Sequence, residues 1–292
     1  MRKFFNPKSI AVVGASRKVD KAGHIIFKNF VENKKRGLFK GEIYPINPHE
    51  ESILGYKCYP SILKIPGKLE SIIIAVPAKI VPKIMEEAVA KGVETATIIT
   101  AGFSEVGNHE LEERVKRIAE KGGIRVLGPN CLGVYNSHTG VDMLFLPETK
   151  ILSSGDEVVA TPRPLPGHIA VVSQSGAFGA AALDHMAGTQ LGVSSLVSFG
   201  NRMDVTESEM LYYFLEDEDT WVILLYAESI DTGREFMEIA KEVTKRKPIV
   251  ALKSGRTEAG ARAAASHTGA VSYTHLRAHE TRHDLVCRLL LE

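Results

Sequence analysis

The sequence predicts a two-domain α/β protein built on parallel sheets, and three observations lead to this fold class. Short runs of buried-strand character alternate with segments of helical apolar spacing along most of the chain, as expected where helices connect parallel strands. The alternation lapses over residues 131–167, where prolines fall at positions 147, 162, 164 and 166. The length of 292 residues also exceeds what one hydrophobic core usually serves, so two domains are expected.

Composition excludes several function classes. Hydrophobic residues make up 44% and charged residues 24% of the chain, and the net charge of +1 indicates neither nucleic acid nor an anionic membrane as a partner. The longest apolar runs, residues 72–76 and 222–226, are too short to span a bilayer, and residues 1–9 lack the apolar core of a signal peptide. The three cysteines show no metal-ligand spacing. We therefore expect a cytoplasmic protein without a metal site of its own.

The chain opens with a strand over residues 10–14, a turn over residues 14–16 and a helix over residues 25–31. A strand, a glycine turn and a helix are the start of a dinucleotide-type fold. Gly14 and Gly23 are too far apart to match the GxGxxG pattern of nicotinamide-binding proteins. The turn still suits a phosphate-bearing ligand at the start of the helix.

The end of the second strand, over residues 43–46, argues against a nicotinamide cofactor. A site for NAD would carry Asp or Glu there to bind the ribose hydroxyls. This chain has Asn47-Pro48 instead.

Three more strands and two helices complete the first domain. We expect the strands over residues 71–76, 96–100 and 124–127, and the helices over residues 82–90 and 110–120. In a parallel sheet the carboxyl ends of the strands meet at one edge, where ligands bind. The loops expected at that edge include Val76-Pro77, Thr100-Ala101-Gly102 and Gly128-Pro129-Asn130.

Residues 131–167 are expected to form a linker with an irregular loop, and the second domain starts at residue 168. Its strands are predicted over residues 169–172, 193–199, 221–227 and 248–252. Ser175 and Gly176 follow the first of these and precede an alanine-rich helix. Backbone N–H groups at such a helix start can bind an anion. The alternative is only a tight turn between strand and helix.

Two titratable residues follow the last two strands. Glu228 comes directly after the strand over residues 221–227, so it is expected to meet the loop after the neighbouring strand. That loop, residues 253–270, is rich in small residues and carries His267, whose ring nitrogen could attack an electrophile. The alternatives are that Glu228 is a helix N-terminal acid and that His267 lies in an exposed polar loop.

Nine stretches resemble, in order, the α subunit of ADP-forming acyl-CoA (acetate–CoA) ligases, which are relatives of the succinyl-CoA synthetase α subunit. They are IAVVGAS, IYPINP, IIIAVPA, ITAGFSE, LGPNCLGV, VVSQSGAFG, SFGNRMDV, ILLYAES and SGRTEAGARAAASHTGA. The resemblance implies a Rossmann-like domain over residues 1–130 that binds coenzyme A. It also implies a flavodoxin-like parallel α/β domain over residues 168–270.

The resemblance also implies residue roles. His267 would carry a phosphoryl group transiently, Glu228 would orient it, and Ser175 and Gly176 would hold the phosphoryl group. Asn130 would lie near the junction of the two sites. The coenzyme A loops would comprise Gly14, Ala15, Ser16, Asn47, Pro48, Val76, Pro77, Thr100, Ala101 and Gly102.

The chain lacks a GxxxxGK[ST] nucleotide-binding motif. The resemblance therefore implies that ATP or ADP with Mg²⁺ is bound by an ATP-grasp β subunit or a fused domain, in a hetero-oligomer. The substrates would be phosphate and a small acyl group that no motif identifies. A CoA-sensing regulatory module without catalysis is the alternative function, and a nicotinamide-dependent oxidoreductase is a third, disfavoured by Asn47.

After Ala270 the resemblance stops. Residues 271–292 contain histidines at 275, 279 and 283, but we do not expect a metal site there. The segment resembles adapter-derived tails of conceptual translations, so we interpret it as a non-native replacement of the family's sequence. An amphipathic helix carrying Leu276, Leu285, Leu289 and Leu290 is the alternative. A genomic read across codon 270 would distinguish the two.

Overall fold

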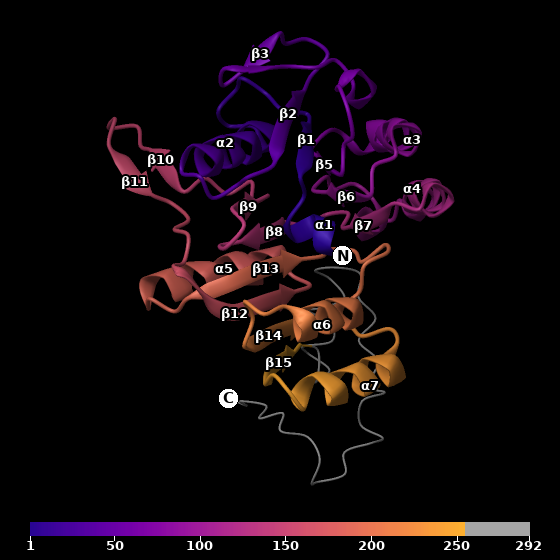
Figure 1. The fold of residues 1–292 in the computed structure, drawn as a ribbon, viewed down its shortest axis with the longest axis vertical. Helices are drawn as coiled ribbons and strands as arrows, with labels where there is room; N and C mark the ends of the chain where they lie inside the picture. The colour runs from indigo at the N-terminus through magenta and orange to yellow at the C-terminus, as the bar shows by residue number, and fades with distance from the viewer. Residues whose placement is uncertain (255–292) are drawn as a thin grey trace.

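The computed structural model describes residues 1–254, which form two layered α/β units one above the other (Figure 1). The upper unit is a five-stranded parallel sheet in the order β2-β1-β5-β6-β7. Its strands are β1 (Ser9–Val13), β2 (Glu42–Ile46), β5 (Ser71–Ile74), β6 (Thr95–Ile98) and β7 (Arg125–Leu127). The predicted alternation of strands and helices is confirmed for this domain.

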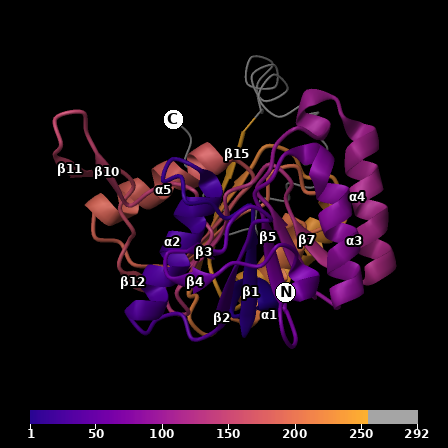
Figure 2. The ribbon, with the colours of Figure 1, turned by 90° about the horizontal axis from the view of Figure 1, so that it is seen from above.

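Helices cover both faces of this sheet, with α2 on one side and α3 and α4 on the other (Figure 2). Strands β1 and β5 are buried along their whole length, and their near-continuous apolar runs, SIAVV and SIII, suit a sheet covered on both faces. Its helices are α1 (Arg2–Phe5), α2 (Ala22–Lys35), α3 (Val81–Lys91) and α4 (His109–Gly122). The smaller elements are β3 (Ser52–Ile53), β4 (Tyr56–Lys57), η1 (Ile62–Lys64), η2 (Ala78–Ile80) and η3 (Ser104–Val106).

The lower unit is a mixed six-stranded sheet in the order β15-β14-β12-β13-β8-β9. Its first four strands are parallel, as predicted. The elements after residue 165 are β12 (Pro166–Ser173), α5 (Gly176–Gly188), β13 (Val193–Ser198), α6 (Glu207–Glu216), β14 (Val222–Ala227), α7 (Gly233–Thr244) and β15 (Ile249–Lys253).

The two faces of the lower sheet pack against different helices. Val171 and Leu196 belong to a cluster shared with Leu183 and Met186 of α5. Val172 and Val197 point to the other face, into a cluster shared with residues of α6 and α7. Successive side chains of a strand alternate between faces, so both faces of these strands are covered. This explains the continuous apolar run VILLYA of β14, whereas β13, VSSLVS, buries serines as well.

The stretch over residues 131–167 differs from the irregular linker that we predicted. Strands β8 (Gly133–Asn136) and β9 (Val141–Asp142) extend the second sheet antiparallel from β13, and β10 (Thr149–Ile151) pairs with β11 (Glu157–Val159) in a projecting hairpin. These strands are short, and β8 and β9 bury polar side chains. Asn136 bonds Ser195, and Asp142 pairs with Arg163. Such satisfied polar residues conceal the apolar pattern by which a strand is recognised.

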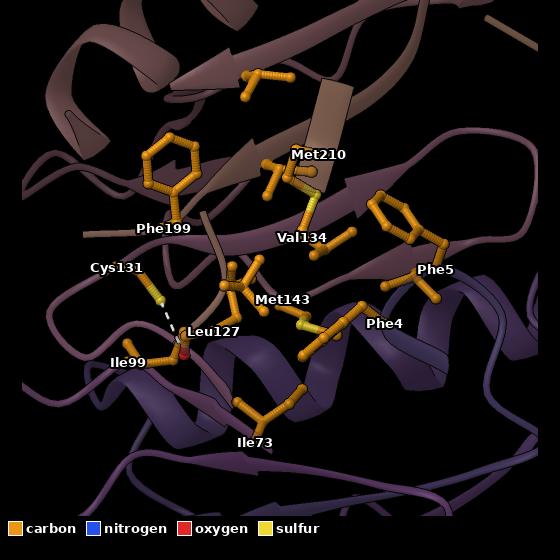
Figure 3. Close-up of a cluster of buried hydrophobic side chains, with 14 of the residues drawn as sticks. Phe4, Phe5, Ile73, Ile99, Leu127, Cys131, Val134, Met143, Phe199 and Met210 are labelled. Carbon is orange, nitrogen blue, oxygen red and sulfur yellow. Dashed lines mark hydrogen bonds between the residues drawn. The ribbon is translucent and has the colours of Figure 1, made fainter. Parts of the chain in front are cut away.

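One hydrophobic cluster runs through both units and fixes their arrangement (Figure 3). Ile73 and Leu127 of the upper sheet belong to it together with Val134 of β8 and Phe199 and Met210 of the lower unit. The thiol of Cys131, also in the cluster, donates to the carbonyl oxygen of Leu127 at 3.9 Å, and burial raises its pKa to about 12.

Within residues 1–254, no helix is both long enough and apolar enough to cross a bilayer. The same residues contain no group of three or more His, Cys, Asp or Glu side chains placed to hold a metal ion.

Candidate functional site

The predicted coenzyme A loops of the first domain all follow parallel strands of one sheet, so they lie along one edge. Backbone and side-chain hydrogen bonds tie them together. Asn47 Nδ2 donates to the carbonyl oxygen of Ala15 at 2.9 Å, and the Thr100 hydroxyl donates to that of Val76 at 2.7 Å. The Asn130 N–H donates to the Thr100 carbonyl oxygen at 3.0 Å. The edge is therefore a continuous set of mutually supported loops.

The start of helix α2 lies directly against the first of these loops. A Cβ atom on Gly23 would lie 2.0 Å from the Gly14 carbonyl oxygen, so only glycine permits this approach. Lys21 provides no side-chain cap for the helix, and the first N–H groups of a helix have no intrahelical acceptor. They can therefore bind an anion. From the sequence we took Gly23 only as a failed GxGxxG match, although this second glycine was the signal for the close contact.

Gly14 is constrained by its own domain. Its φ is +91°, and an added Cβ would lie 2.4 Å from the Ala75 carbonyl oxygen of the neighbouring chain segment. A bulky residue at this position would therefore disturb the fold as well as the ligand loop, because its side chain would collide with the backbone after β5.

We therefore predict that Gly14→Ala lowers the free energy of unfolding by roughly 2–4 kcal/mol. Gly55→Ala is the matched control, because Gly55 also has a positive φ, +82°, but has no atom within 4 Å of the added Cβ. It carries the backbone strain without the collision. Urea unfolding of both variants measures the difference, and equal losses would show that the collision with Ala75 is relieved without cost.

In the second domain, Ser175 is the N-cap of α5 and Gly176 is its first residue. The Ser175 hydroxyl accepts the Phe178 N–H at 3.3 Å, which leaves the N–H groups of Gly176 and Ala177 at the first turn for a ligand. A Cβ on Gly176 would lie 3.1 Å from Leu132. The predicted helix start is therefore present and closely packed.

Glu228 directly follows β14 and is buried. Gln174 Oε1 accepts the backbone N–H groups of Glu228 at 2.8 Å and of Ser229 at 3.0 Å, and the Tyr226 hydroxyl lies 3.5 Å from the Glu228 carboxylate. The carbonyl oxygen of Glu228 accepts from Lys253 Nζ at 2.7 Å. Its position is thus set by contacts on both sides.

Strand β15 pairs with β14 and delivers the following chain to Glu228. The Ser254 N–H donates to the carbonyl oxygen of Ala227, the residue before Glu228, at 3.0 Å. The chain that leads into the small-residue loop therefore lies beside this acid. Burial lowers the pKa of Lys253, and the nearby Glu228 carboxylate opposes that shift. His267 lies outside the described residues, as does the segment 271–292.

A pocket of about 710 Å³ lies between the two units and contains residues of both. It brings Asn130 of the first domain together with Ser175 and Gly176 of the second. The loops at Gly14, Asn47 and Val76 do not line it. A hollow of about 850 Å³ near Met1 and the acidic end of α6 holds none of the predicted site residues.

Asn201 joins the two units at this pocket. Its side-chain amide donates to Glu105 at 2.6 Å, to Glu112 at 2.9 Å and to the Ser104 hydroxyl at 3.0 Å. Burial would raise the pKa of Glu105, but hydrogen bonds from Asn201 and from the Gly102 N–H outweigh it and hold that pKa below its ordinary value. The carboxylate that accepts from the loop at Gly102 therefore also contacts the second domain.

Arg202 links the same loop to the region of Glu228. Its guanidinium donates to Glu207 at 2.9 Å, to both the hydroxyl and the carbonyl oxygen of Ser229 at 2.9 Å, and to Asp231 at 2.8 Å. Asn201 and Arg202 belong to the motif SFGNRMDV, but we predicted no role for either from the sequence. Both could have been found from the pattern that predicted Ser175 and Glu228, because each is a polar residue shortly after a buried strand.

Two family models match the chain. A CoA binding domain matches residues 8–137. A succinyl-CoA ligase like flavodoxin domain matches residues 166–279, which extends past Ala270. The fold class is thereby a CoA-binding domain followed by a flavodoxin-like domain, as predicted.

Relatives are similar over both domains. The ADP-forming acetate–CoA ligase of Methanocaldococcus jannaschii is 46% identical over 266 residues, 91% of this chain and 35% of that protein. The α subunit of ADP-forming acetate–CoA ligase I of Pyrococcus furiosus is 42% identical over 274 residues, 92% of this chain and 55% of that subunit.

A solved structure agrees. Acetyl-coenzyme A synthetase 1 of Candidatus Korarchaeum cryptofilum, in complex with phosphate and ADP, superposes with a TM-score of 0.84 at 41% identity, covering 94% of this chain and 55% of that one. The chain therefore belongs to the class of proteins that join a CoA-binding domain to a succinyl-CoA ligase-like domain. Within that class it is similar to the α subunit of ADP-forming acetate–CoA ligases. It spans 35% to 55% of the length of these three proteins.

Proposed function

We propose that the chain is the CoA-binding, phosphohistidine-carrying part of an ADP-forming acyl-CoA ligase. One observation carries the proposal: a single pocket joins the Asn130 loop of the CoA-binding domain to the helix start at Ser175 and Gly176. The strand end that bears Glu228 is tied to the same place through Gln174, which lines the pocket. A thioester and a phosphate could meet there.

The proposed reaction has three steps. A phosphate oxygen attacks the thioester carbonyl carbon of the acyl-CoA, so that a C–O bond forms, the C–S bond breaks and the thiolate takes up a proton. The unprotonated ring nitrogen of His267 then attacks the phosphorus of the acyl phosphate, and the carboxylate leaves as the P–O bond breaks. An oxygen of the terminal phosphate of ADP finally takes the phosphoryl group, which yields ATP and neutral imidazole.

The residues of this chain supply orientation and charge. The N–H groups at Gly176 and Ala177 would hold the phosphoryl oxygens without offering a competing nucleophile. The Glu228 carboxylate would accept a hydrogen bond from the other ring nitrogen of His267, which selects the tautomer and stabilises the phosphoimidazole cation. Burial of Glu228 in a low-dielectric setting strengthens that hydrogen bond.

The nucleotide would come from outside this chain. We propose an ATP-grasp β subunit or fused domain that binds ATP or ADP with Mg²⁺, hence a hetero-oligomer in the cytoplasm. The description of the Pyrococcus furiosus relative as a subunit α supports a partner. A CoA-sensing module without catalysis would not need His267 and Glu228 together.

The test is transfer of label from [γ-³²P]ATP to the chain, in the complete ligase with its nucleotide-binding partner. We predict that Glu228→Gln slows this labelling roughly 100-fold, because the neutral amide keeps the shape but not the charge. CoA affinity measured by calorimetry should not change. Glu218→Gln, an exposed acid near the end of α6, is the control and should label normally. Loss of CoA affinity with normal labelling would place Glu228 in the other site.

A further inference from the structure

The pocket between the two units is lined by both polar and apolar side chains. Gln174, Asn201, Arg202, Ser229 and Asp231 contribute polar groups. The apolar lining is contributed by Ile99, Leu132, Phe145, Leu146, Ala177 and Ala180. Pockets that bind small molecules commonly combine a few orienting polar groups with apolar residues, here called the apolar wall, so the two sets of residues suit two parts of one ligand.

Part of the apolar wall adjoins the helix start proposed to hold phosphate. Ala177 and Ala180 lie in the first turns of α5, directly after Gly176. Leu132 would lie 3.1 Å from a Cβ on Gly176, so it contacts that helix start closely. In an acyl phosphate a single oxygen separates the acyl carbon from phosphorus. A phosphoryl group at Gly176 therefore requires the acyl chain to lie within a few ångströms of it, against this wall.

Phe145 is the largest apolar side chain of the wall, and Leu146 follows it. Both are half-buried, packed against the cluster that contains Leu183 and Leu196. Ala177 and Ala180 have the smallest side chains of the apolar wall, and a longer side chain at either position would take up part of the pocket. The size of the acyl chain would then be limited by Phe145 and Leu146.

The backbone that carries Phe145 and Leu146 is held rigidly. Arg163 donates to the Leu146 carbonyl oxygen at 2.9 Å and forms an ion pair with Asp142 at 2.8 Å, and both side chains of that pair are at most 10% exposed. Asn29 of the first domain donates to the Leu144 carbonyl oxygen at 2.8 Å. A wall whose backbone is fixed by Arg163 and Asn29 can discriminate by size, because a closely packed interior yields little to a larger ligand.

We infer that Phe145 and Leu146, together with Ala177 and Ala180, form the subsite for the acyl chain, and that Phe145 sets the upper limit on its size. The inference rests on the proposed function. The ligands of the subsite are carboxylic acids with an uncharged apolar chain. The pocket's one cationic side chain among the described residues, Arg202, is already paired with Glu207 and Asp231, so a second carboxylate on the chain would lack a partner.

The experiment compares kcat/KM for acetate and for phenylacetate in the complete ligase. Phe145→Ala should raise the ratio of phenylacetate to acetate at least tenfold, because a few carbon atoms of pocket space change selectivity by that much. Ala180→Leu should lower the ratio of isovalerate to acetate by a similar factor. Ratios cancel any loss of folded enzyme, so a destabilised variant remains informative.

Val159→Ala is the matched control. Val159 belongs to the same chain segment but is 68% exposed on β11 and does not line the pocket, so its ratios should match wild type. If the wild-type complex ligates acids and the kcat/KM ratios in both pocket variants equal those of wild type, the subsite is wrong and the proposed function stands. A wild-type complex that joins no acid to CoA, tested with label transfer from [γ-³²P]ATP as a separate readout, would overturn the proposed function and the subsite with it.

Discussion

His267→Ala is expected to abolish phosphorylation of the chain and, with it, all net ligation of acid to CoA. The imidazole is the proposed carrier of the phosphoryl group, and alanine has no nitrogen to replace it. The label should appear in wild type from either direction, from [γ-³²P]ATP with the nucleotide-binding partner or from acyl-CoA with ³²P-phosphate. It should be acid-labile and base-stable, as a phosphoramidate is. CoA binding, a property of the first domain, should be retained in calorimetry.

Two control variants separate this outcome from trivial ones. Ser266→Ala removes the adjacent hydroxyl and should keep the label, because the label is expected on His267. A phosphoserine at Ser266 would instead be lost in this variant, and in wild type it would be stable to acid. His168→Ala should also keep it, because His168 stacks on Trp221 at a ring-centroid distance of 3.6 Å and does not line the pocket between the units. Label that survives in His267→Ala would refute the assignment of the phosphoryl carrier.

Arg202→Ala is expected to lower the free energy of unfolding by about 3–5 kcal/mol, the usual cost of leaving a buried charge without its partner. The Arg202 and Glu207 side chains are 8% and 2% exposed, and their ion pair spans 2.9 Å. Removing the guanidinium leaves the Glu207 carboxylate buried without its cation and frees Ser229, the neighbour of Glu228. Urea unfolding measures the stability, and the labelling rate from [γ-³²P]ATP should fall in the same variant.

Arg246→Ala is the matched control for the buried pair. Arg246 also pairs with a glutamate, Glu216, at 2.9 Å, but both side chains are at least 60% exposed. Exposed pairs of this kind contribute no more than about 1 kcal/mol. Combining Arg202→Ala with Glu207→Gln should recover part of the stability, because the buried charge is then gone. Equal effects of Arg202→Ala and Arg246→Ala would mean that burial of the first pair carries no energetic weight.

Local patterns were sufficient for most elements of both domains. Helix α3 is followed by Gly92 and α4 by Gly123, and both glycines adopt the left-handed conformation that glycine adopts easily. The strand order could not be read in the same way. Strands β8 and β9 were missed because they bury Asn136 and Asp142, whose partners Ser195 and Arg163 are far away in the sequence.

The residues of the candidate site also fall into those that local patterns predicted and those that depend on tertiary contacts. Ser175, Gly176 and Glu228 were predicted correctly as residues at a helix start and at a strand end, because such positions follow from the local alternation of apolar and polar residues. The roles of Asn201 and Arg202 were not predicted. Each acts through partners such as Glu105 and Ser229 that only the packing of one unit on the other brings within reach.

The sequence by itself determined the α/β class, the loops at the ends of the parallel strands and the resemblance on which the proposal of a phosphohistidine at His267 rests. Each depends on residues close together in the chain, where the period of apolar side chains dictates helix or strand. Only the tertiary structure decided that Asn130 and Ser175 share a pocket, that Gly14 is held by the backbone at Ala75, and that Phe145 lies in the wall beside the helix start. Those relations depend on how two sheets pack through one shared core, since contacts between distant segments leave no periodic trace in either of them.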